Sequence, residues 1–460
     1  MVESHDLSGE KIAVCFVGLY AYSLFNPDSD YLFGGSEIRS HLISKTLSQS
    51  PDYDITYVVH YYGQRRRETF GNITVYAHTG FTDVGFQGPQ FIARLLQDIG
   101  DSGGVFIHTT RFPYRRIKNW DPTLLIKAAV VALFTMPMFV SRTLSDWWQR
   151  PRQLHIRDYV IPYRRVKTYS RIDADIYCVL GVANLSGEIA AYCKDADKRF
   201  VLFIGSDKNL NADYQPTSTE RNHYGDLHHV CHYAIANADL IFTQHETQNR
   251  LLKDRFDKLG IVVRNPIDLT TRVHSPGDSV EGRFALWVGR ADDFVKMPMI
   301  LIRLAKACPD TSFLMVMNPH IRQVEEQVYR EKPANVTIVR SVPYTEIERL
   351  FSQAFVLVNT SLFEGFPNTF LQAGKYGVPI LSYQVDPDDF IQRYDCGIVA
   401  QSDFDKLVDG MRTIQKNRLN GNDQYSRNIR KYVEENHDLE EQTGIIDRAL
   451  RELIAENNPE

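Results

Sequence analysis

Short apolar runs alternate with amphipathic stretches along this chain, and the alternation starts again after one polar interruption. The first series opens with an apolar run from Ile12 to Gly18 and an amphipathic stretch from Ser36 to Leu47. The second series opens with Phe284–Val288, after a stretch rich in Pro, Gly, Ser and Thr at 264–283. Strands that alternate with helices form parallel sheets covered on both faces. The pattern therefore predicts an α/β chain with two such sheets.

The length of the chain agrees with two domains. A chain of 460 residues is too long for one ordinary hydrophobic core and favours two domains of roughly 200 residues each. We place an N-terminal domain at 1–270, a linker at 271–283 and a C-terminal domain at 284–460. Further strand-like runs are Ile55–His60, Val105–His108, Asp175–Leu180, Phe200–Ile204, Asp239–Phe242, Gly260–Val263, Phe313–Met317, Val336–Val339, Phe355–Val358 and Ile380–Ser382, with helices expected at 345–353 and 368–376.

The composition indicates a globular chain that stays in the cytoplasm. Apolar residues make up 43% of the chain and charged residues 24%, as in ordinary globular proteins. A formal net charge of −5 argues against a nucleic-acid binder. The six cysteines lie far apart with no C-x-x-C pair, a pattern that favours reduced thiols over disulfides or a zinc site. The polar, acid-containing N-terminus has no apolar segment of a secretory signal.

Residues 359–383, NTSLFEGFPNTFLQAGKYGVPILSY, carry the most specific pattern in the chain. A strand ends in a loop that contains Glu364 and Gly365, and a helix starts near Asn368. Ligands bind beyond the carboxyl ends of parallel strands, and a helix start offers unpaired N–H groups to a phosphate. A carboxylate beside a glycine suits the hydroxyl groups of a sugar. An ordinary helix start with a solvated glutamate fits the same residues.

The segment closely resembles the E-G-F-P, second acidic residue and G-x-P-[VI] motif of the retaining glycosyltransferases of family 4, also called group 1. The resemblance implies the GT-B architecture, in which two Rossmann-like parallel α/β domains face each other across a cleft. It also implies that Glu364, with the backbone amides of Gly365 and Phe366, holds the hydroxyl groups of the donor sugar.

The same resemblance implies that the start of the helix near Asn368 binds the nucleotide. The amides of Asn368 and Thr369 are implied to meet the diphosphate. The family has a second Glu, eight residues after the first, that binds the ribose, and this chain has Gln372 there. An amide can still exchange hydrogen bonds with a ribose diol, without the charge assistance that a carboxylate gives.

Two further segments resemble the family. FALWVGRADDFVKMP (284–298) contains Arg290 and Lys296, which in the family clamp the donor diphosphate and would stabilise the charge that develops on the leaving nucleotide. Two unrelated surface cations are the alternative. Gly34 and Gly35 precede a helix and resemble the glycine-rich first loop of the family, where backbone N–H groups approach a phosphate or the acceptor.

The N-terminal half departs from the family pattern at one position. Members often carry a His in an H-G-[ST]-D context, whereas FVLFIGSDKNL (200–210) has Ile204 there. His108, at the end of a strand-like run, is the nearest substitute, with a purely structural histidine as the alternative. Asp207 is a candidate for a sugar or acceptor hydroxyl, and a turn or a helix cap explains it equally well.

No metal cofactor is expected. The stretch HYGDLHHVCHY (223–233) holds four histidines and a cysteine, but no second ligand cluster supports a zinc site. The resemblance implies that no divalent cation is required, because Arg290, Lys296 and the helix-start amides neutralise the diphosphate. The nucleotide sugar, a UDP- or GDP-sugar, is then a substrate, and no cofactor is needed.

Residues 111–171 stand out by their charge. They contain thirteen Lys and Arg against three Asp and Glu, and they enclose a run without charged residues from Ala128 to Val140. That run is too short to span a bilayer, which takes ~20 residues. Apolar residues flanked by Arg and by Trp147 and Trp148 suit the headgroup region of an anionic membrane. A buried helix beside a solvated basic segment is the alternative.

The sequence therefore predicts a glycosyltransferase that moves a sugar from a nucleotide sugar to a glycan or polyprenyl-linked glycolipid, with retention at the anomeric carbon. A role in cell-surface polysaccharide synthesis, at the inner face of the membrane, fits the basic segment. The alternatives are a glycan synthase or phosphorylase of the same fold, and a non-catalytic, membrane-associated protein that binds nucleotide sugars.

Overall fold

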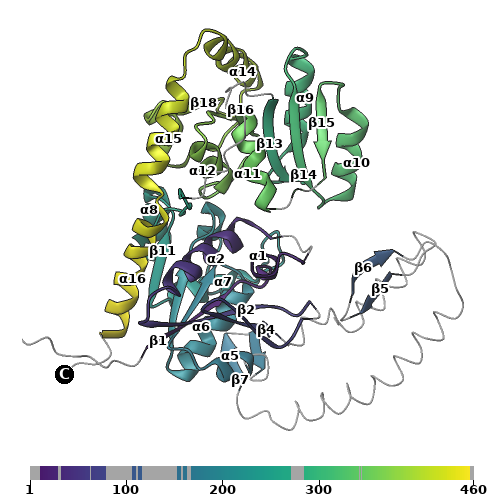
Figure 1. The fold of residues 1–460 in the computed structure, drawn as a ribbon. Coiled ribbons are helices and arrows are strands. Elements are labelled where there is room, and N and C mark those ends of the chain that lie inside the picture. Colours follow the sequence, from purple (N-terminus) through teal and green to yellow (C-terminus); the bar gives the residue numbers. More distant parts are fainter. Residues whose placement is uncertain are drawn as a thin grey trace, which may run out of the picture. The chain divides into compact units, whose positions relative to one another are not determined.

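A computed structural model describes residues 11–29, 33–62, 64–78, 106–109, 112–116, 153–156, 159–162, 167–270, 284–340, 342 and 344–455. The chain divides into two compact units (Figure 1). The first comprises Met1–Leu202 and Asp213–Leu240, and the second comprises Phe203–Ala212 and Ile241–Glu460. The linker predicted at 271–283 lies outside the described residues. The domain limits predicted at 270 and 284 therefore stay predictions.

The first sheet has eight strands in the order β12-β11-β10-β9-β1-β2-β4-β3. Its strands are β1 (Ile12–Val17), β2 (Tyr53–His60), β3 (Arg67–Phe70), β4 (Ile73–His78), β9 (Ile176–Leu180), β10 (Arg199–Phe203), β11 (Leu240–Thr243) and β12 (Ile261–Val262). β1 pairs in parallel with β2 and with β9, whereas β3 pairs antiparallel with β4. The central strands are near-continuous apolar runs because helices cover both faces of a parallel sheet.

The helices of the first unit are α1 (Tyr22–Phe25), α2 (Gly35–Leu47), α5 (Lys167–Ile172), α6 (Asn184–Ala196) and α7 (His228–Ala236). Two separate antiparallel ribbons join β5 (Phe106–Thr109) to β6 (Phe112–Arg116), and β7 (Gln153–Ile156) to β8 (Tyr159–Pro162). The run Val105–His108 is thus a strand, but it is not part of a parallel sheet. Its partner β6 follows after only two residues, a connection that permits antiparallel pairing alone.

The second sheet has six strands in the order β15-β14-β13-β16-β17-β18, and all its neighbours pair in parallel. Its strands are β13 (Phe284–Arg290), β14 (Phe313–Asn318), β15 (Val336–Val339), β16 (Ala354–Asn359), β17 (Ile380–Ser382) and β18 (Gly397–Val399). Successive side chains of β13 enter opposite layers: Ala285 and Trp287 belong to one buried cluster, and Leu286 belongs to the other. Both faces of this sheet are therefore covered.

The helices of the second unit are α8 (Glu246–Phe256), α9 (Pro298–Ala307), α10 (Arg322–Glu331), α11 (Tyr344–Gln353), α12 (Asn368–Lys375), α13 (Phe390–Arg393), α14 (Phe404–Leu419), α15 (Gln424–Asn436) and α16 (Leu439–Ala455), with the 3₁₀ turns η3 (Asp207–Leu210) and η4 (Pro387–Asp389). Strands and helices alternate from β13 to β18, as the sequence pattern requires. The predicted α/β class, with two sheets of mainly parallel strands and flanking helices, is confirmed.

All six cysteines are buried and free. Burial raises the pKa of the Cys15 thiol to about 12, so this thiol stays protonated. Within the described part of the chain, no helix is long and apolar enough to cross a membrane.

Candidate functional site

Two loops of the second unit, 290–297 and 360–367, follow the carboxyl ends of β13 and β16, which are neighbours in the sheet. The Leu362 N–H donates to the Val295 carbonyl at 2.9 Å. The Thr360 hydroxyl donates to the Lys296 carbonyl at 2.6 Å and accepts from the Trp287 indole N–H at 2.8 Å. These bonds join the loops at the edge of the sheet where ligands of α/β proteins bind.

The carboxylate of Asp292 fixes the conformation of the first loop by accepting hydrogen bonds from the loop backbone. This side chain is 2% exposed, and its Oδ1 accepts the N–H groups of Val295 at 2.6 Å and Lys296 at 2.9 Å. Its Oδ2 accepts from the Arg290 Nε at 2.6 Å. Burial raises the pKa of Asp292, but these hydrogen bonds and the charge of Arg290 outweigh it and leave the pKa below its ordinary value. Asp292 thus stays ionised and holds the guanidinium of Arg290.

Lys296, the cation predicted to bind the donor diphosphate, pairs with Glu364, the carboxylate predicted to bind the donor sugar. The ammonium of Lys296 contacts Oε1 of Glu364, and both side chains are about one-fifth exposed. The same Oε1 accepts from the Ser361 hydroxyl at 2.9 Å. The structure therefore brings Arg290, Lys296 and Glu364 together on two linked loops, as the sequence predicts. Their roles toward a ligand stay predictions.

The Phe366 backbone is already hydrogen-bonded to residues that sequence analysis did not single out. Its N–H donates to Oε1 of Gln244 at 2.9 Å, and its carbonyl accepts from Nδ2 of Asn265 at 2.7 Å. The Gln244 Nε2 donates to Oδ1 of Asn265 at 3.1 Å, so the two amides also hold each other. Gln244 follows β11 and Asn265 follows β12, and only the folded chain brings them to the loop.

The side chain of Gln244 leaves no room for a side chain at position 365. A Cβ on Gly365 would lie 1.8 Å from the Gln244 Oε1 and 2.9 Å from the Gly205 carbonyl oxygen. We expect Gly365→Ala to displace Gln244 and to leave the buried Phe366 N–H without an acceptor, at a cost of about 1–3 kcal/mol. Denaturant unfolding of the purified variant measures this loss.

The control for that substitution is Gly444→Ala in α16, where a Cβ meets no heavy atom closer than 3.9 Å. We expect this change to be neutral or stabilising, because alanine favours a helix. In a Gln244→Ala background, Gly365→Ala should cost much less than in the wild type, because the main steric conflict is gone. Additive losses would show that Gly365 is required for another reason.

The helix α12 starts where the sequence places it. Asn368 is its first residue, and its Oδ1 accepts from Nδ2 of Asn265 at 3.2 Å. Thr369 lies in the same first turn and is partly buried. Gln372, the predicted ribose contact, is buried one turn further on. The helix N-terminus thus follows directly after the loop that contains Glu364.

Asp207, a candidate residue from the sequence, lies in an ion-pair network with His245 and Asp388. Nε2 of His245 lies 3.2 Å from Oδ1 of Asp207, and Nδ1 lies 3.4 Å from Oδ1 of Asp388. Burial opposes the imidazolium, but the two carboxylates outweigh it and raise the pKa of His245 to about 9. Gln248 adds a hydrogen bond to Asp207 at 3.0 Å. These contacts favour a structural role for Asp207.

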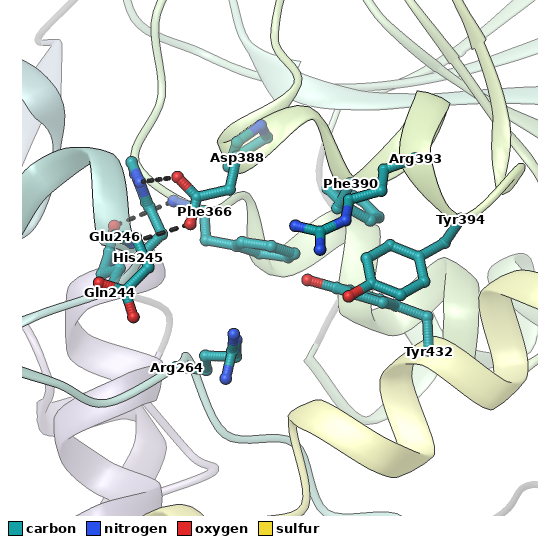
Figure 2. Close-up of a pocket in the computed structure, with 11 residues that line it drawn as sticks. Gln244, His245, Glu246, Arg264, Phe366, Asp388, Phe390, Arg393, Tyr394 and Tyr432 are labelled. Carbon is teal, nitrogen blue, oxygen red and sulfur yellow. Dashed lines mark hydrogen bonds and ion pairs between the residues drawn. The ribbon is translucent and has the colours of Figure 1, made fainter.

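Asp388 also caps α8 from outside the helix. Its carboxylate accepts the N–H group of Glu246 at 2.8 Å (Figure 2). It also accepts the N–H group of Thr247 at 2.9 Å. Burial raises the pKa of Asp388, but the hydrogen bonds from His245 and Thr247 hold it well below its ordinary value. The network therefore carries charge at neutral pH and joins η3, α8 and η4.

A pocket of the second unit lies beside this network (Figure 2). Its volume is about 70 Å³, well below the several hundred Å³ of a typical small-molecule site. It is therefore too small for a sugar nucleotide in this structure. Its lining residues are Gln244, His245, Glu246, Arg264, Phe366, Pro387, Asp388, Phe390, Arg393, Tyr394 and Tyr432.

Three predicted site residues belong to the first unit. Gly34 is the N-cap of α2, and its N–H donates to Oε2 of Glu37 at 2.9 Å. Gly35 is the first residue of that helix. His108 lies on β5 in the antiparallel ribbon, and its side chain is outside the described part of the structure. Their roles toward donor or acceptor stay predictions.

The histidines of 223–233 have partners within the first unit. Nδ1 of His229 donates to the Ser218 carbonyl at 2.8 Å, and Nδ1 of His228 lies 3.3 Å from the Ser218 hydroxyl. Among the residues that the structure describes, no three His, Cys, Asp or Glu side chains form a group that could hold a metal ion.

Comparison with protein families identifies one segment. Residues 282–417 match the family described as glycosyl transferases group 1. The match includes both loops of the candidate site, with Arg290, Lys296 and Glu364. No curated protein matches the sequence at a significant level.

Solved structures share the fold of the whole chain at low sequence identity. Sucrose-phosphate synthase from Thermosynechococcus elongatus has a TM-score of 0.66 at 14% identity, covering 97% of this chain and 100% of its own. Anabaena Alr3699/HepE in complex with UDP-glucose has a TM-score of 0.58 at 13% identity, covering 96% and 100%. TarM has a TM-score of 0.59 at 10% identity, covering 97% and 99%. These likenesses show a shared GT-B fold.

Proposed function

We propose that this glycosyltransferase, whose residues 282–417 match group 1 enzymes, transfers a sugar from a nucleotide-sugar donor to a hydroxyl group of a glycan or glycolipid. The observation that carries the proposal is the pair of linked loops after β13 and β16. They place two cations and a carboxylate at the ligand-binding edge of a parallel sheet. The complex of Alr3699/HepE with UDP-glucose supports a nucleotide sugar as the donor.

The charges at the loops suit a diphosphate leaving group. Glu364 now neutralises Lys296, and Asp292 neutralises Arg290. A donor diphosphate would compete for both cations and release Glu364 toward the hydroxyl groups of the donor sugar. Cations held ready for the charge that develops on the leaving phosphate stabilise the transition state. On this proposal the protein's own cations take the place of a divalent metal.

Retention at the anomeric carbon is part of the proposal. It rests on the resemblance of residues 359–383 to retaining enzymes. Glu364, the carboxylate of the second loop, is paired with Lys296 and assigned to the donor sugar. We therefore favour a front-face reaction, in which the leaving phosphate oxygen takes the proton of the acceptor hydroxyl. The protein contributes position and electrostatic stabilisation.

A screen of donors tests this function. UDP-, GDP- and ADP-sugars should be compared for thermal stabilisation of the protein, and the best one should then be radiolabelled and incubated with membrane lipids and glycans. Transfer of label supports the proposal. Binding without transfer to any acceptor would favour the non-catalytic alternative, and release of a sugar phosphate from a glycan in the presence of phosphate would favour a phosphorylase.

A lipid-linked acceptor is supported by the composition of residues 111–171, most of which lie outside the described residues. We expect the protein to bind anionic vesicles, because each Lys or Arg near such a surface contributes about 1 kcal/mol. Salt should weaken the binding without abolishing it, because salt screens only the electrostatic part. Vesicle sedimentation measures both effects.

Neutral vesicles are the control for that experiment, and they should retain less protein. Replacing Arg115, Arg116, Arg164 and Arg165 by Ser should release the protein further while nucleotide binding persists. A protein that stays in the supernatant beside anionic vesicles at low salt would remove the main support for a lipid-linked acceptor.

A further inference from the structure

Lys208 lies beside both loops of the candidate site and has no role in the proposed function so far. It belongs to η3, which follows β10 and packs within the second unit. Its ammonium nitrogen lies 3.7 Å from the ring centroid of Phe294 and 3.7 Å from that of Phe363. Phe294 lies between Arg290 and Lys296 in the first loop. Phe363 directly precedes Glu364 in the second loop. Lys208 therefore contacts both loops of the candidate site.

The position of η3 is fixed by contacts that do not involve the ammonium group of Lys208. Oδ1 of Asn209 accepts the N–H groups of Gly205 at 2.9 Å and Ser206 at 3.1 Å, and the Leu210 side chain is fully buried. Asp207 is held by His245 and Gln248. The backbone that carries Lys208 is therefore ordered without any contribution from its charge.

The charge of Lys208 is not compensated by an acid in the described part of the structure. Arg290 pairs with Asp292, and Lys296 pairs with Glu364. The contacts that the structure describes for the Lys208 ammonium group are with two aromatic rings, whose attraction for a cation is weaker than a buried ion pair. Its partial burial lowers its pKa from the ordinary value, which reflects a charge that has lost water without gaining a carboxylate. Arg290 and Lys296 each have a carboxylate partner, so Lys208 is the one of these three cations without an acidic partner among the described residues.

We infer that Lys208 is a third cation for the donor diphosphate, held between Phe294 and Phe363 until a nucleoside diphosphate group enters. The inference rests on the proposed function and adds a residue to it. A diphosphate oxygen would give the ammonium group a hydrogen-bond acceptor, and no ion pair among the described residues has to break for this contact. Phe363 is 43% exposed and Lys208 is partly exposed, so solvent reaches this contact.

Lys208→Met tests the inference, because methionine has a similar length and still packs against aromatic rings. Calorimetry should compare the affinity for a nucleoside diphosphate, taken from UDP, GDP or ADP, with the affinity for the matching nucleoside. We expect the variant to bind the diphosphate about tenfold more weakly, as one lost charge-assisted hydrogen bond implies. Its affinity for the nucleoside should stay unchanged. Lys208→Arg should restore most of the diphosphate affinity.

The control is Lys416→Met, which removes one charge from an exposed position on α14 and should leave both affinities unchanged. Lys208→Gln provides a second variant without charge, should the methionine side chain disturb the loops. Wild-type diphosphate affinity in both Lys208 variants would overturn the inference. Equal losses for nucleoside and diphosphate would also overturn it, because they would indicate a purely structural contact.

Failure of the proposed function gives a different result from failure of this inference. If the wild-type protein binds none of the three nucleoside diphosphates, the proposed donor site is wrong and the role of Lys208 falls with it. If the wild type binds one of them and the Lys208 variants bind it equally well, the proposed donor site is supported and only the role of Lys208 as a third cation is rejected.

Discussion

Alanine in place of Arg290 or Lys296 is expected to lower the rate of sugar transfer by about 100-fold or more, because a phosphate-binding cation contributes roughly 3 kcal/mol in the transition state. The larger loss is expected for Lys296, which also balances the charge of Glu364. Steady-state kinetics with the donor found in the screen measures the effect. The fold should persist, because Arg290 is the last residue of β13, Lys296 lies on the loop after it, and neither side chain is part of a buried cluster.

Arg322→Ala and Lys416→Ala are matched controls at exposed positions on α10 and α14, and both should keep the wild-type rate. Thermal unfolding of each variant shows whether a slow enzyme is still folded. A folded protein that retains nearly the wild-type rate after both site substitutions would contradict a diphosphate site at these loops.

Glu364→Gln is expected to impair transfer strongly while the nucleotide alone still binds. The physical reason is that the carboxylate is assigned to the donor sugar, whereas the nucleotide is held by its diphosphate and ribose. A glutamine retains an oxygen that can accept from the Ser361 hydroxyl, so the loop should keep its shape. Transfer rates and calorimetric affinities for the nucleoside diphosphate, measured side by side, test this expectation.

Glu326→Gln, an exposed change on α10, is the control and should alter neither quantity. If Glu364→Gln weakens nucleotide binding and transfer to the same degree, the carboxylate does not act through the sugar. The pairing of Lys296 with Glu364 would then be the more important contact, because its loss could misplace the phosphate cation.

Most of the parallel strands could be predicted from sequence because strands buried on both faces are short, continuous apolar runs. This explains the agreement between the predicted run Ile12–Gly18 and β1, and between Phe284–Val288 and β13. The parallel strands β4 and β18 were not predicted. β3 was not predicted because RETF has no such run and lies at the edge of the sheet. β5 was predicted, but its pairing was wrong, because a short apolar run carries no information about its partner.

The candidate site could be predicted only where its residues are close in sequence. Arg290 and Lys296 are six positions apart, and Glu364 lies in one continuous motif, so spacing alone identifies them. Gln244 hydrogen-bonds a backbone N–H that lies 122 positions further along the chain. Asp388 caps a helix that begins 142 positions earlier. No local pattern reports such distant partners, and for the same reason Lys208 could not be identified from the sequence.

The partners of Phe366 have a consequence for dissecting the protein into fragments. A fragment that begins at 284 contains the whole six-stranded sheet, yet it lacks Gln244 and Asn265, which satisfy the Phe366 backbone. It also lacks the Asn265 carbonyl, to which Nδ1 of the fully buried His437 donates at 2.8 Å. In such a fragment the Phe366 backbone and the His437 side chain would lose these hydrogen-bond partners beside the loop that contains Glu364. A fragment intended to bind the donor therefore has to retain 203–212 and 241–270, although both precede the family match in the sequence.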